Sequence, residues 1–306
     1  MEFEKYFDSI YEEYDKYLVV PVALIALSVL ALGFSLVTTG EVVQKGLDFT
    51  GGTEATYSIN ESFTTGEIEQ VFLDAGRSKV QVFKTTSGEN TGLSVRVPPP
   101  KLKGQEAAEI LNSAGYNVSV QSTRELSASV SDAFFTQAVL AFVMAFTIMS
   151  LVIFYAFKDL TPSAAVIFAA AGDIIFALAG MSILGIPLTL GSLAALLMLI
   201  GYSVDTDIVL STRVLKQERN TVKDRIWDSM KTGVTMSSGG IAGFTLLYIV
   251  SQMIVGPSEL SNIAAVMVIG LLADMPFTWF GNAIILKKYV DGEIPSINIE
   301  KVIPWR

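Results

Sequence analysis

The chain has 306 residues, of which 51% are hydrophobic and 17% charged, a composition too apolar for an ordinary soluble domain of this size. Its 30 acidic and 21 basic residues give a net charge of −9, so we expect no general attraction to nucleic acid. The absence of Cys and His excludes disulfides, thiol nucleophiles, an imidazole proton relay and a His-based zinc site. We therefore expect no metal site and no cofactor, and any proton handling must use carboxylates, hydroxyls, Lys or water.

The chain begins with a polar segment and a first apolar stretch. Residues 1–17 are acidic with interspersed aromatic residues, which favours a short helix at the cytoplasmic membrane interface. Residues 18–37 carry no charge and have the length that a spanning helix requires, about 20 residues. Pro21 lies in the first turn of that stretch, where its missing N–H does little harm.

Residues 38–132 are more polar and are predicted to form one domain outside the membrane. Alternating and helical patterns of apolar residues predict four strands and two helices, at 53–59, 64–75, 80–84, 93–97, 105–114 and 117–121. Thr64 and Glu67 match a capping box ahead of the first helix, and residues 87–90 are predicted to form a turn. The order β-α-β-β-α-β predicts an α+β ferredoxin-like domain.

A glycine-rich segment, Gly46-Leu-Asp-Phe-Thr-Gly-Gly52, lies between the first span and this domain. Gly46, Gly51 and Gly52 predict a tight turn or a close approach of the backbone to a neighbour. Asp48 is the one charged residue among them. The Gly-Lys-Ser/Thr sequence of a phosphate-binding loop is missing, so we do not expect this segment to bind a nucleotide.

Residues 133–286 contain five more apolar stretches, each long enough to cross a bilayer with some tilt. They are residues 133–157, 163–185, 188–212, 233–255 and 260–286. Residues 221–230 carry an apolar stripe and are predicted to form a separate short helix on the inner surface. Lys and Arg concentrate around that segment and in the tail, residues 287–306. This distribution predicts a multi-pass protein of the cell membrane with both termini in the cytoplasm and residues 40–132 outside.

Four acidic residues fall inside the predicted spans, where a charged side chain costs roughly 2.5–3.5 kcal/mol on insertion scales. They are Asp173, Asp205, Asp207 and Asp274. Asp205 and Asp207 flank Thr206 and point about 200° apart on a helix, so they cannot both face one cavity directly. We expect the four acids and Thr206 to form a water-accessible cation relay. The alternative for each acid is a structural hydrogen bond to Ser, Thr or the backbone.

Two further residues bear on this relay. Pro276 stands two residues after Asp274 and is expected to loosen the sixth span, which favours a mobile or hydrated site. Lys231 stands at the cytoplasmic mouth of the fifth span. It is either a relay residue or a lysine that extends toward the membrane surface, and its position alone favours the second interpretation.

Two segments resemble signatures of the SecD/SecF family of protein-export membrane proteins. The glycine-rich segment is similar to the signature that follows the first span of that family. Gly201 and Tyr202, followed by Ser-Val and later by Arg213, are similar to the fourth-span signature of its SecF branch. Six spans with one large outer domain also fit that branch. The wider superfamily, the resistance-nodulation-division transporters, places proton-carrying acids in the fourth span.

The fourth-span segment also departs from the bacterial signature of the family. Aligned without gaps, Asp205, Thr206 and Asp207 occupy its Asn, Asp and Thr positions. Thr206 thus replaces the family's Asp and has an acid on each side, a pattern that resembles the archaeal branch. Which of the two acids inherits the family role stays open, and Lys231 aligns with an Arg of the family.

The resemblance implies a membrane subunit that assists protein translocation and is not an enzyme. Its implied partners are a SecD-like membrane subunit, the SecY protein-conducting channel, the translocating polypeptide and membrane lipid, and a proton or sodium gradient would drive the outer domain. Other possibilities are a small-molecule exporter subunit of the same superfamily, an intramembrane aspartyl protease, and a scaffold that only stabilises its partner. The exporter predicts two outer domains and twelve spans in one chain, and the signatures of the protease are missing here.

Overall fold

We describe the protein from a computed structural model. The structure describes residues 7, 10–59, 61, 63–77, 80–87, 90–98, 102–217, 220–254 and 258–295. Residues 1–6 and 8–9 of the predicted N-terminal segment, residues 88–89 of the predicted turn and residues 296–306 of the predicted tail lie outside these ranges.

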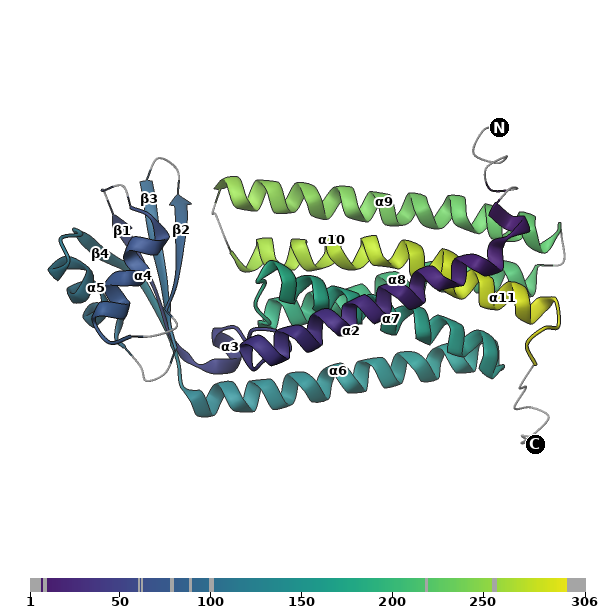
Figure 1. The fold of residues 1–306 in the computed structure, drawn as a ribbon, viewed down its shortest axis with the longest axis horizontal. Coiled ribbons are helices and arrows are strands. Elements are labelled where there is room, and N and C mark those ends of the chain that lie inside the picture. The colour runs from purple at the N-terminus through teal and green to yellow at the C-terminus, as the bar shows by residue number, and fades with distance from the viewer. Residues whose placement is uncertain are drawn as a thin grey trace.

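A bundle of long helices carries a small sheet domain at one end, and the first and last described segments of the chain lie at the opposite end (Figure 1). Six of the described helical segments are long and apolar enough to cross a membrane. The predicted class, a polytopic helical membrane protein with one ferredoxin-like domain, is confirmed.

The helices of the bundle are longer than the apolar stretches that predicted them when α10 is taken together with its continuation. They are α2 (Val19–Thr39), α6 (Ala128–Phe157), α7 (Leu160–Leu184), α8 (Leu190–Lys216), α9 (Val222–Ile254) and α10 (Glu259–Phe277). A π-helical segment, η2 (Thr278–Asn282), and then α11 (Ala283–Val290) continue α10. Gly40 and Gly185 end α2 and α7 in the left-handed conformation that glycine adopts most readily.

The predicted separate helix at residues 221–230 is wrong, because these residues form the first turns of the 33-residue helix α9. Gly233 does not interrupt α9. A Cβ at that position would meet the side chains of Trp279 and Thr206, so the glycine serves a close helix contact rather than a break. The fifth membrane helix therefore extends through the segment that the sequence assigned to the membrane surface.

The sheet domain has the predicted order of elements. It consists of β1 (Gly52–Ile59), α4 (Thr65–Asp74), β2 (Gln81–Ser87), β3 (Asn90–Val97), α5 (Gly104–Ser113) and β4 (Val118–Leu126). The strands are antiparallel in the order β2-β3-β1-β4, as in the ferredoxin-like fold. Thr64 and Glu67 form the predicted capping box of α4. Tyr57 is fully buried in the domain core, where its hydroxyl donates to the carbonyl of Gly104 at 2.8 Å.

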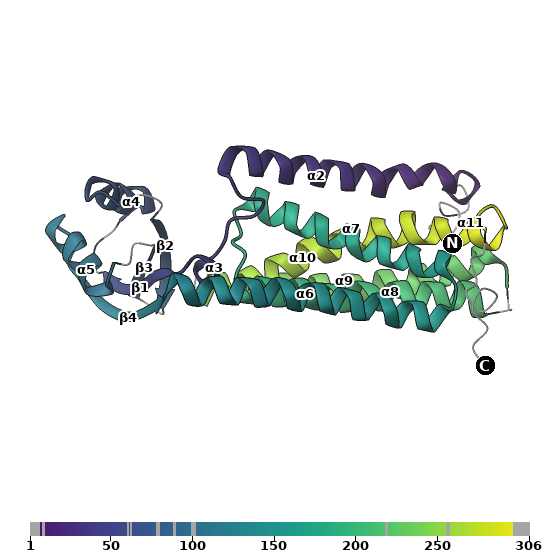
Figure 2. The ribbon, with the colours of Figure 1, turned by 90° about the horizontal axis from the view of Figure 1, so that it is seen from below.

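The bundle has a buried centre and an exposed periphery. In α7, α8 and α10 with its continuation, half or more of the most apolar segment is buried, against 11% in α2, α6 and α9. The second view shows α2 lying on the outside of the bundle, beside α7 (Figure 2). Helices α7, α8 and α10 carry Asp173, Asp207 and Asp274, so the acids lie on the three helices with the least access to lipid.

The described part of the N-terminal segment packs on one end of the bundle. Its described residues include Phe7 and the 3-10 helix η1 (Tyr14–Leu18). Phe7 and Tyr14 are buried, and the Phe7 ring stacks on Trp227 of α9 at 4.8 Å. The hydroxyl of Tyr14 donates to the carbonyl oxygen of Trp279. The described part of the segment therefore covers the end of the bundle opposite the sheet domain.

Candidate ion-relay site

Three carboxylates meet in the centre of the bundle. Asp173, Asp207 and Asp274 are 1%, 0% and 0% exposed, and Asp173 is close enough to the other two to interact with them electrostatically. Within the described residues, no Lys or Arg forms an ion pair with any of the three. An unpaired buried carboxylate is very costly, so the cluster needs protons, bound cations or water to offset its charge.

Hydroxyl and amide groups join two of these carboxylates across helices. The Thr278 hydroxyl lies 2.9 Å from Asp207 Oδ1 and 3.2 Å from Asp274 Oδ1, so its proton can serve either acid. Asn282 Nδ2 donates to Asp207 Oδ1 at 2.8 Å, and the Ser237 hydroxyl donates to Asp274 Oδ2 at 3.0 Å. Asp207 and Asp274 are therefore connected through one hydroxyl group.

The third carboxylate has its own partner on the neighbouring helix. The hydroxyl of Ser203, on α8, donates to Asp173 Oδ2 on α7. Ser203 stands one turn before Asp207 on α8, and both side chains are fully buried. Helix α8 thus contacts the acid of α7 through Ser203 and the acid of α10 through Asp207 and Thr278.

The π-helical segment η2 supplies Thr278 and Asn282. Pro276 lacks a backbone N–H and lies two residues before η2, where the helix widens from α to π geometry. Such π segments are frequent at functional sites. The sequence predicted a loosened helix at this point, and the structure resolves that loosening as a π-helical turn that presents both polar side chains to Asp207.

Several buried oxygen atoms of Asp207, Asp173 and neighbouring helix residues have no hydrogen-bond partner among the residues that the structure describes. They are Asp207 Oδ2, Asp173 Oδ1, Asn282 Oδ1, Thr206 Oγ1 and Ser211 Oγ. Buried polar atoms are normally hydrogen-bonded, so a concentration of free acceptors is unusual. Chemically, these oxygens could accept a proton, a water molecule or a small dehydrated cation.

The structure separates the three consecutive polar residues of α8. Asp207 faces the buried cluster, whereas Asp205 is exposed on the outer surface of the helix. Thr206 is fully buried and points at Gly233 of α9 and at Trp279. The two acids that the sequence placed in one relay therefore have different surroundings, and only Asp207 contacts another member of the cluster.

The remaining fourth-span residues position α8 against α9. Arg213 donates to the carbonyl of Asp228 at 2.7 Å and to the Thr232 hydroxyl at 2.9 Å. Tyr202 donates to the backbone of α9 at 3.0 Å, and Gly201 is exposed. Lys231 is exposed too and pairs with Asp228 at 2.7 Å. The structure does not bring Lys231 into the buried cluster.

The glycine-rich segment connects the sheet domain to the start of α8. It forms the short helix α3 (Leu47–Thr50), in which Asp48 is buried. Asp48 Oδ2 accepts from the backbone N–H of Leu190 at 3.0 Å, and Asp48 Oδ1 accepts from Arg124 of β4 at 2.8 Å. One carboxylate thus holds both the first residue of a membrane helix and the last strand of the sheet.

The glycines make this contact possible. Gly46 donates its N–H to the Leu188 carbonyl at 2.7 Å, and a Cβ at Gly46 would overlap Thr189. Gly52 has φ +123°, and a Cβ there would strike the backbone of Val97. Gly51 has φ +70°, also in the region that favours glycine. The structure confirms the prediction that the backbone of this segment approaches its neighbours closely.

A second carboxylate, Glu259, holds the same helix end. Glu259 begins α10, and its Oε1 accepts from the backbone N–H of Gly191 at 3.0 Å and from the Thr189 hydroxyl. Acidic groups are favourable at helix N-termini because the free N–H groups and the helix dipole attract negative charge. The N-terminus of α8 is therefore held by Asp48 from the sheet side and by Glu259 from α10.

Sequence reasoning missed Thr278, Asn282, Ser237 and Glu259 as site residues. A usable signal was present for two of them. Thr278 and Asn282 stand four and eight residues after Asp274, on one face of a predicted span, and polar residues inside spans are functional candidates. No sequence signal links Glu259 to α8, because that contact joins residues 68 positions apart.

The fold and the site together define a class: a polytopic membrane protein with a buried, unpaired carboxylate cluster and a ferredoxin-like domain tied to one of the acid-bearing helices. Residues 106–292 match the family described as "Protein export membrane protein SecD/SecF, C-terminal". The protein-export membrane protein SecF of Methanothermobacter thermautotrophicus is 37% identical over 93% of this chain and 95% of its own length. SecF of Methanocaldococcus jannaschii is 34% identical over 91% of this chain and 96% of its own. The chain belongs to the SecF family of protein-export membrane proteins.

Solved structures agree with this fold. The crystal structure of SecDF from Thermus thermophilus, a translocon-associated membrane protein, superposes with a TM-score of 0.73 at 21% identity. The match covers 91% of this chain and 38% of the SecDF chain. SecDF in its super-membrane-facing form gives a TM-score of 0.58 at 20% identity. This chain spans little more than a third of the SecDF chain.

Proposed function

We propose that this SecF-family subunit couples protein export to an ion gradient through Asp207, Asp274 and Asp173. The observation that carries the proposal is the hydroxyl of Thr278, which lies within hydrogen-bonding distance of both Asp207 and Asp274. When either acid binds a cation, the acid that accepts the hydrogen bond of the Thr278 hydroxyl changes. The contact between α8 and α10 therefore depends on the occupancy of the cluster.

We propose that the sheet domain moves in response. Helix α8 carries Asp207 beyond its midpoint and is held by Asp48 and Glu259 at its N-terminus. The helix rises about 26 Å from Leu190 to Asp207, at about 1.5 Å per residue. A stiff helix transmits a displacement over that distance, and Asp48 passes it to Arg124 in the sheet. The outer domain would then help to draw the translocating polypeptide outward.

The proposed orientation places both termini in the cytoplasm and residues 40–132 outside. Support comes from the bundle end opposite the sheet domain, which carries most of the described cations of the bundle. They include Lys16, Lys158, Arg213, Lys216, Lys223, Arg225, Lys231, Lys287 and Lys288. Cytoplasmic loops of membrane proteins are enriched in Lys and Arg.

A proton is the first candidate for the coupling cation, because carboxylates and a shared hydroxyl suffice to carry it. Sodium is a second candidate. The unpartnered oxygens of Asp207, Asn282 and Ser211 are hard ligands of the kind that alkali and alkaline-earth ions prefer. The two cations differ in one testable respect, since only sodium coupling depends on the sodium concentration at constant pH.

We propose a SecD-like subunit and the protein-conducting SecY channel as partners. Support for the first comes from the SecDF chain, of which this chain matches 38%, and for the second from its description as translocon-associated. Asp205 adds an argument from this chain, since an exposed carboxylate in a membrane helix is unfavourable against lipid. Gly201 is exposed on the same helix and allows close helix contact. A partner subunit that covers Gly201 and Asp205 would remove the carboxylate from lipid.

We further propose that the chain has no enzymatic activity. An aspartyl protease needs two carboxylates that act on one water molecule. Here the hydroxyl of Thr278 lies between Asp207 and Asp274, within hydrogen-bonding distance of both. Incubation of the purified protein with a membrane peptide tests this point, and cleavage that depends on Asp207 would refute it.

The main test measures export into sealed vesicles with and without an imposed ion gradient. Asp207→Asn and Asp274→Asn should each abolish the stimulation by the gradient, while the protein remains inserted and bound to its partners. Asp132→Asn is the matched control, because it makes the same change in α6, where the side chain is exposed and lies outside the cluster. Unchanged stimulation in Asp207→Asn would overturn the coupling proposal, and varying sodium at constant pH distinguishes the two cations.

A further inference from the structure

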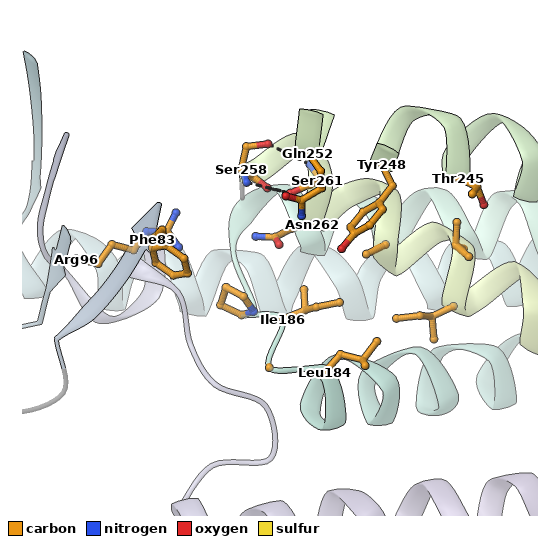
Figure 3. Close-up of a pocket in the computed structure, with 15 residues that line it drawn as sticks. Phe83, Arg96, Leu184, Ile186, Thr245, Tyr248, Gln252, Ser258, Ser261 and Asn262 are labelled. Atoms are coloured by element: carbon orange, nitrogen blue, oxygen red, sulfur yellow. Dashed lines mark hydrogen bonds between the residues drawn. The ribbon is translucent and has the colours of Figure 1, made fainter. Parts of the chain in front are cut away.

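A cavity of about 430 Å³ lies where the sheet domain meets the bundle. The close-up shows Phe83 and Arg96 on one side, extending from strands of the sheet, and Tyr248, Gln252 and Asn262 on the other (Figure 3). The latter three belong to the end of α9 and the start of α10. A cavity of this size is within the range of ligand-binding pockets, about 300–1,000 Å³.

The wall on the bundle side combines apolar and amide groups. Ile186 and Ile269 contribute apolar surface. Gln252 and Asn262 are half-buried, and neither side chain forms a hydrogen bond with any described residue. Each amide offers two donors and one acceptor, so two half-buried amides without partners present an unused capacity for hydrogen bonding. An occupant with matching donors and acceptors would satisfy them.

The cavity carries no free charge among its described lining residues. Its cation, Arg96, pairs with Glu54 at 2.7 Å, and both side chains are largely buried. The guanidinium also lies over the ring of Phe83, 4.8 Å from its centre. A phosphate-bearing lipid headgroup is bound through free cations or several charge-assisted hydrogen bonds. An uncharged occupant therefore fits this wall better than an anionic lipid.

We propose that this cavity binds a short extended segment of the translocating polypeptide. Backbone N–H and C=O groups match the free amides of Gln252 and Asn262, and one apolar side chain can contact Ile186, Ile269 and the ring of Phe83. This assignment rests on the proposed export function and names the place where the substrate is held. Because Phe83 belongs to the sheet and Asn262 to α10, movement of the sheet domain opens or closes the cavity.

Disulfide crosslinking tests the proposal without background, because the chain contains no Cys. Asn262→Cys and Gln252→Cys are each combined with a secretory polypeptide that carries one cysteine and is stalled in the channel. Leu246→Cys is the matched control, since Leu246 lies on α9 but is 62% exposed and does not line the cavity. We expect crosslinks at positions 262 and 252 at least five times more abundant than at position 246.

A second variant tests the role of the amide itself. Asn262→Leu keeps the side-chain size and removes the hydrogen-bonding groups, so crosslinking from Gln252→Cys should fall severalfold in that background. Equal crosslinking at all three positions, or none at position 262 while export proceeds, would overturn the proposal. The cysteine at position 262 can also be treated with maleimide in vesicles that hold phospholipid but no polypeptide. Protection of that cysteine would assign the cavity to lipid and would also overturn the proposal.

The crosslinking needs no ion gradient, so its outcome is separable from that of the coupling test. A crosslink that forms in the Asp207→Asn background would support the cavity even if coupling failed. Loss of the crosslink with intact gradient stimulation would instead reject the cavity and leave the relay in place.

Discussion

Asp48 offers the sharpest test of how the membrane helices communicate with the outer domain. Its carboxylate accepts the N–H of Leu190 at the start of α8 and pairs with Arg124 of β4. Loss of a side-chain cap costs roughly 0.5–2 kcal/mol. The pair with Arg124 adds little, about 0.2–1 kcal/mol, because the Arg124 side chain is 58% exposed.

Replacement of Asp48 by Ala should therefore weaken the connection by roughly 1–3 kcal/mol. Since about 1.4 kcal/mol corresponds to a factor of ten, the equilibrium constant for the connected state falls by about fivefold to a hundredfold. Export stimulated by the gradient should fall by a similar factor, and export without a gradient should stay the same. The assay is the vesicle experiment with gradient on and off, accompanied by hydrogen exchange at residues 190–193.

Two control variants separate the two contacts of this carboxylate. Arg124→Ala removes only the exposed ion pair, so we expect a loss of less than about fivefold. Asp48→Asn keeps an oxygen that can accept from Leu190 and should retain most of the stimulation. Full gradient stimulation in Asp48→Ala, together with faster hydrogen exchange at the start of α8, would show that the helix end is loosened without consequence for coupling. That result would refute transmission through Asp48.

Three further predictions concern single residues. Thr278→Val removes the hydroxyl between two carboxylates, and the loss of its one hydrogen bond, worth about 1.5–3 kcal/mol, should reduce gradient-stimulated export at least tenfold in the vesicle assay. Gly52→Ala places a Cβ against the backbone of Val97 at φ +123°, so thermal unfolding of the outer domain should show a loss of roughly 1–3 kcal/mol. Tyr57→Phe should cost about 1–3 kcal/mol, because it leaves a buried carbonyl without a donor. Burial also raises the pKa of the Tyr57 phenol above its value in the unfolded chain, about 10. The free energy that Tyr57 contributes to folding is therefore complete below a pH of about 10 and declines as the pH rises above that value. The free energy of unfolding of the Phe variant should lack this decline.

The fold was largely accessible from the sequence because its signals are local. Uninterrupted apolar stretches predict spanning helices, since a bilayer leaves the backbone few alternatives. The capping box at Thr64 and the glycine after α4 define a helix within a few residues of chain. The prediction failed at residues 221–230, where polar residues suggested the membrane surface. There the helix continues because Gly233 packs against Trp279, a contact between different helices.

The candidate site was accessible only in part. The cost of a charge inside a bilayer identified the four intramembrane acids, which is a property of each residue and needs no neighbours. The role of each acid depends on the direction in which its side chain points from the helix. Asp205 and Asp207 are two residues apart and look equivalent in the sequence, yet one is exposed and the other is fully buried. Which face of α8 meets the bundle core decides between them.

The sequence by itself determined that the chain spans a membrane six times, carries one ferredoxin-like domain and holds acids where charge is unfavourable. Only the tertiary structure decided that Asp207 shares a hydroxyl with Asp274, and that Asp48 and Glu259 hold the start of α8. The physical reason is that burial cost and helix periodicity act along the chain. A hydrogen bond between helices depends on positions that only packing sets, over separations such as the 142 residues from Asp48 to Leu190.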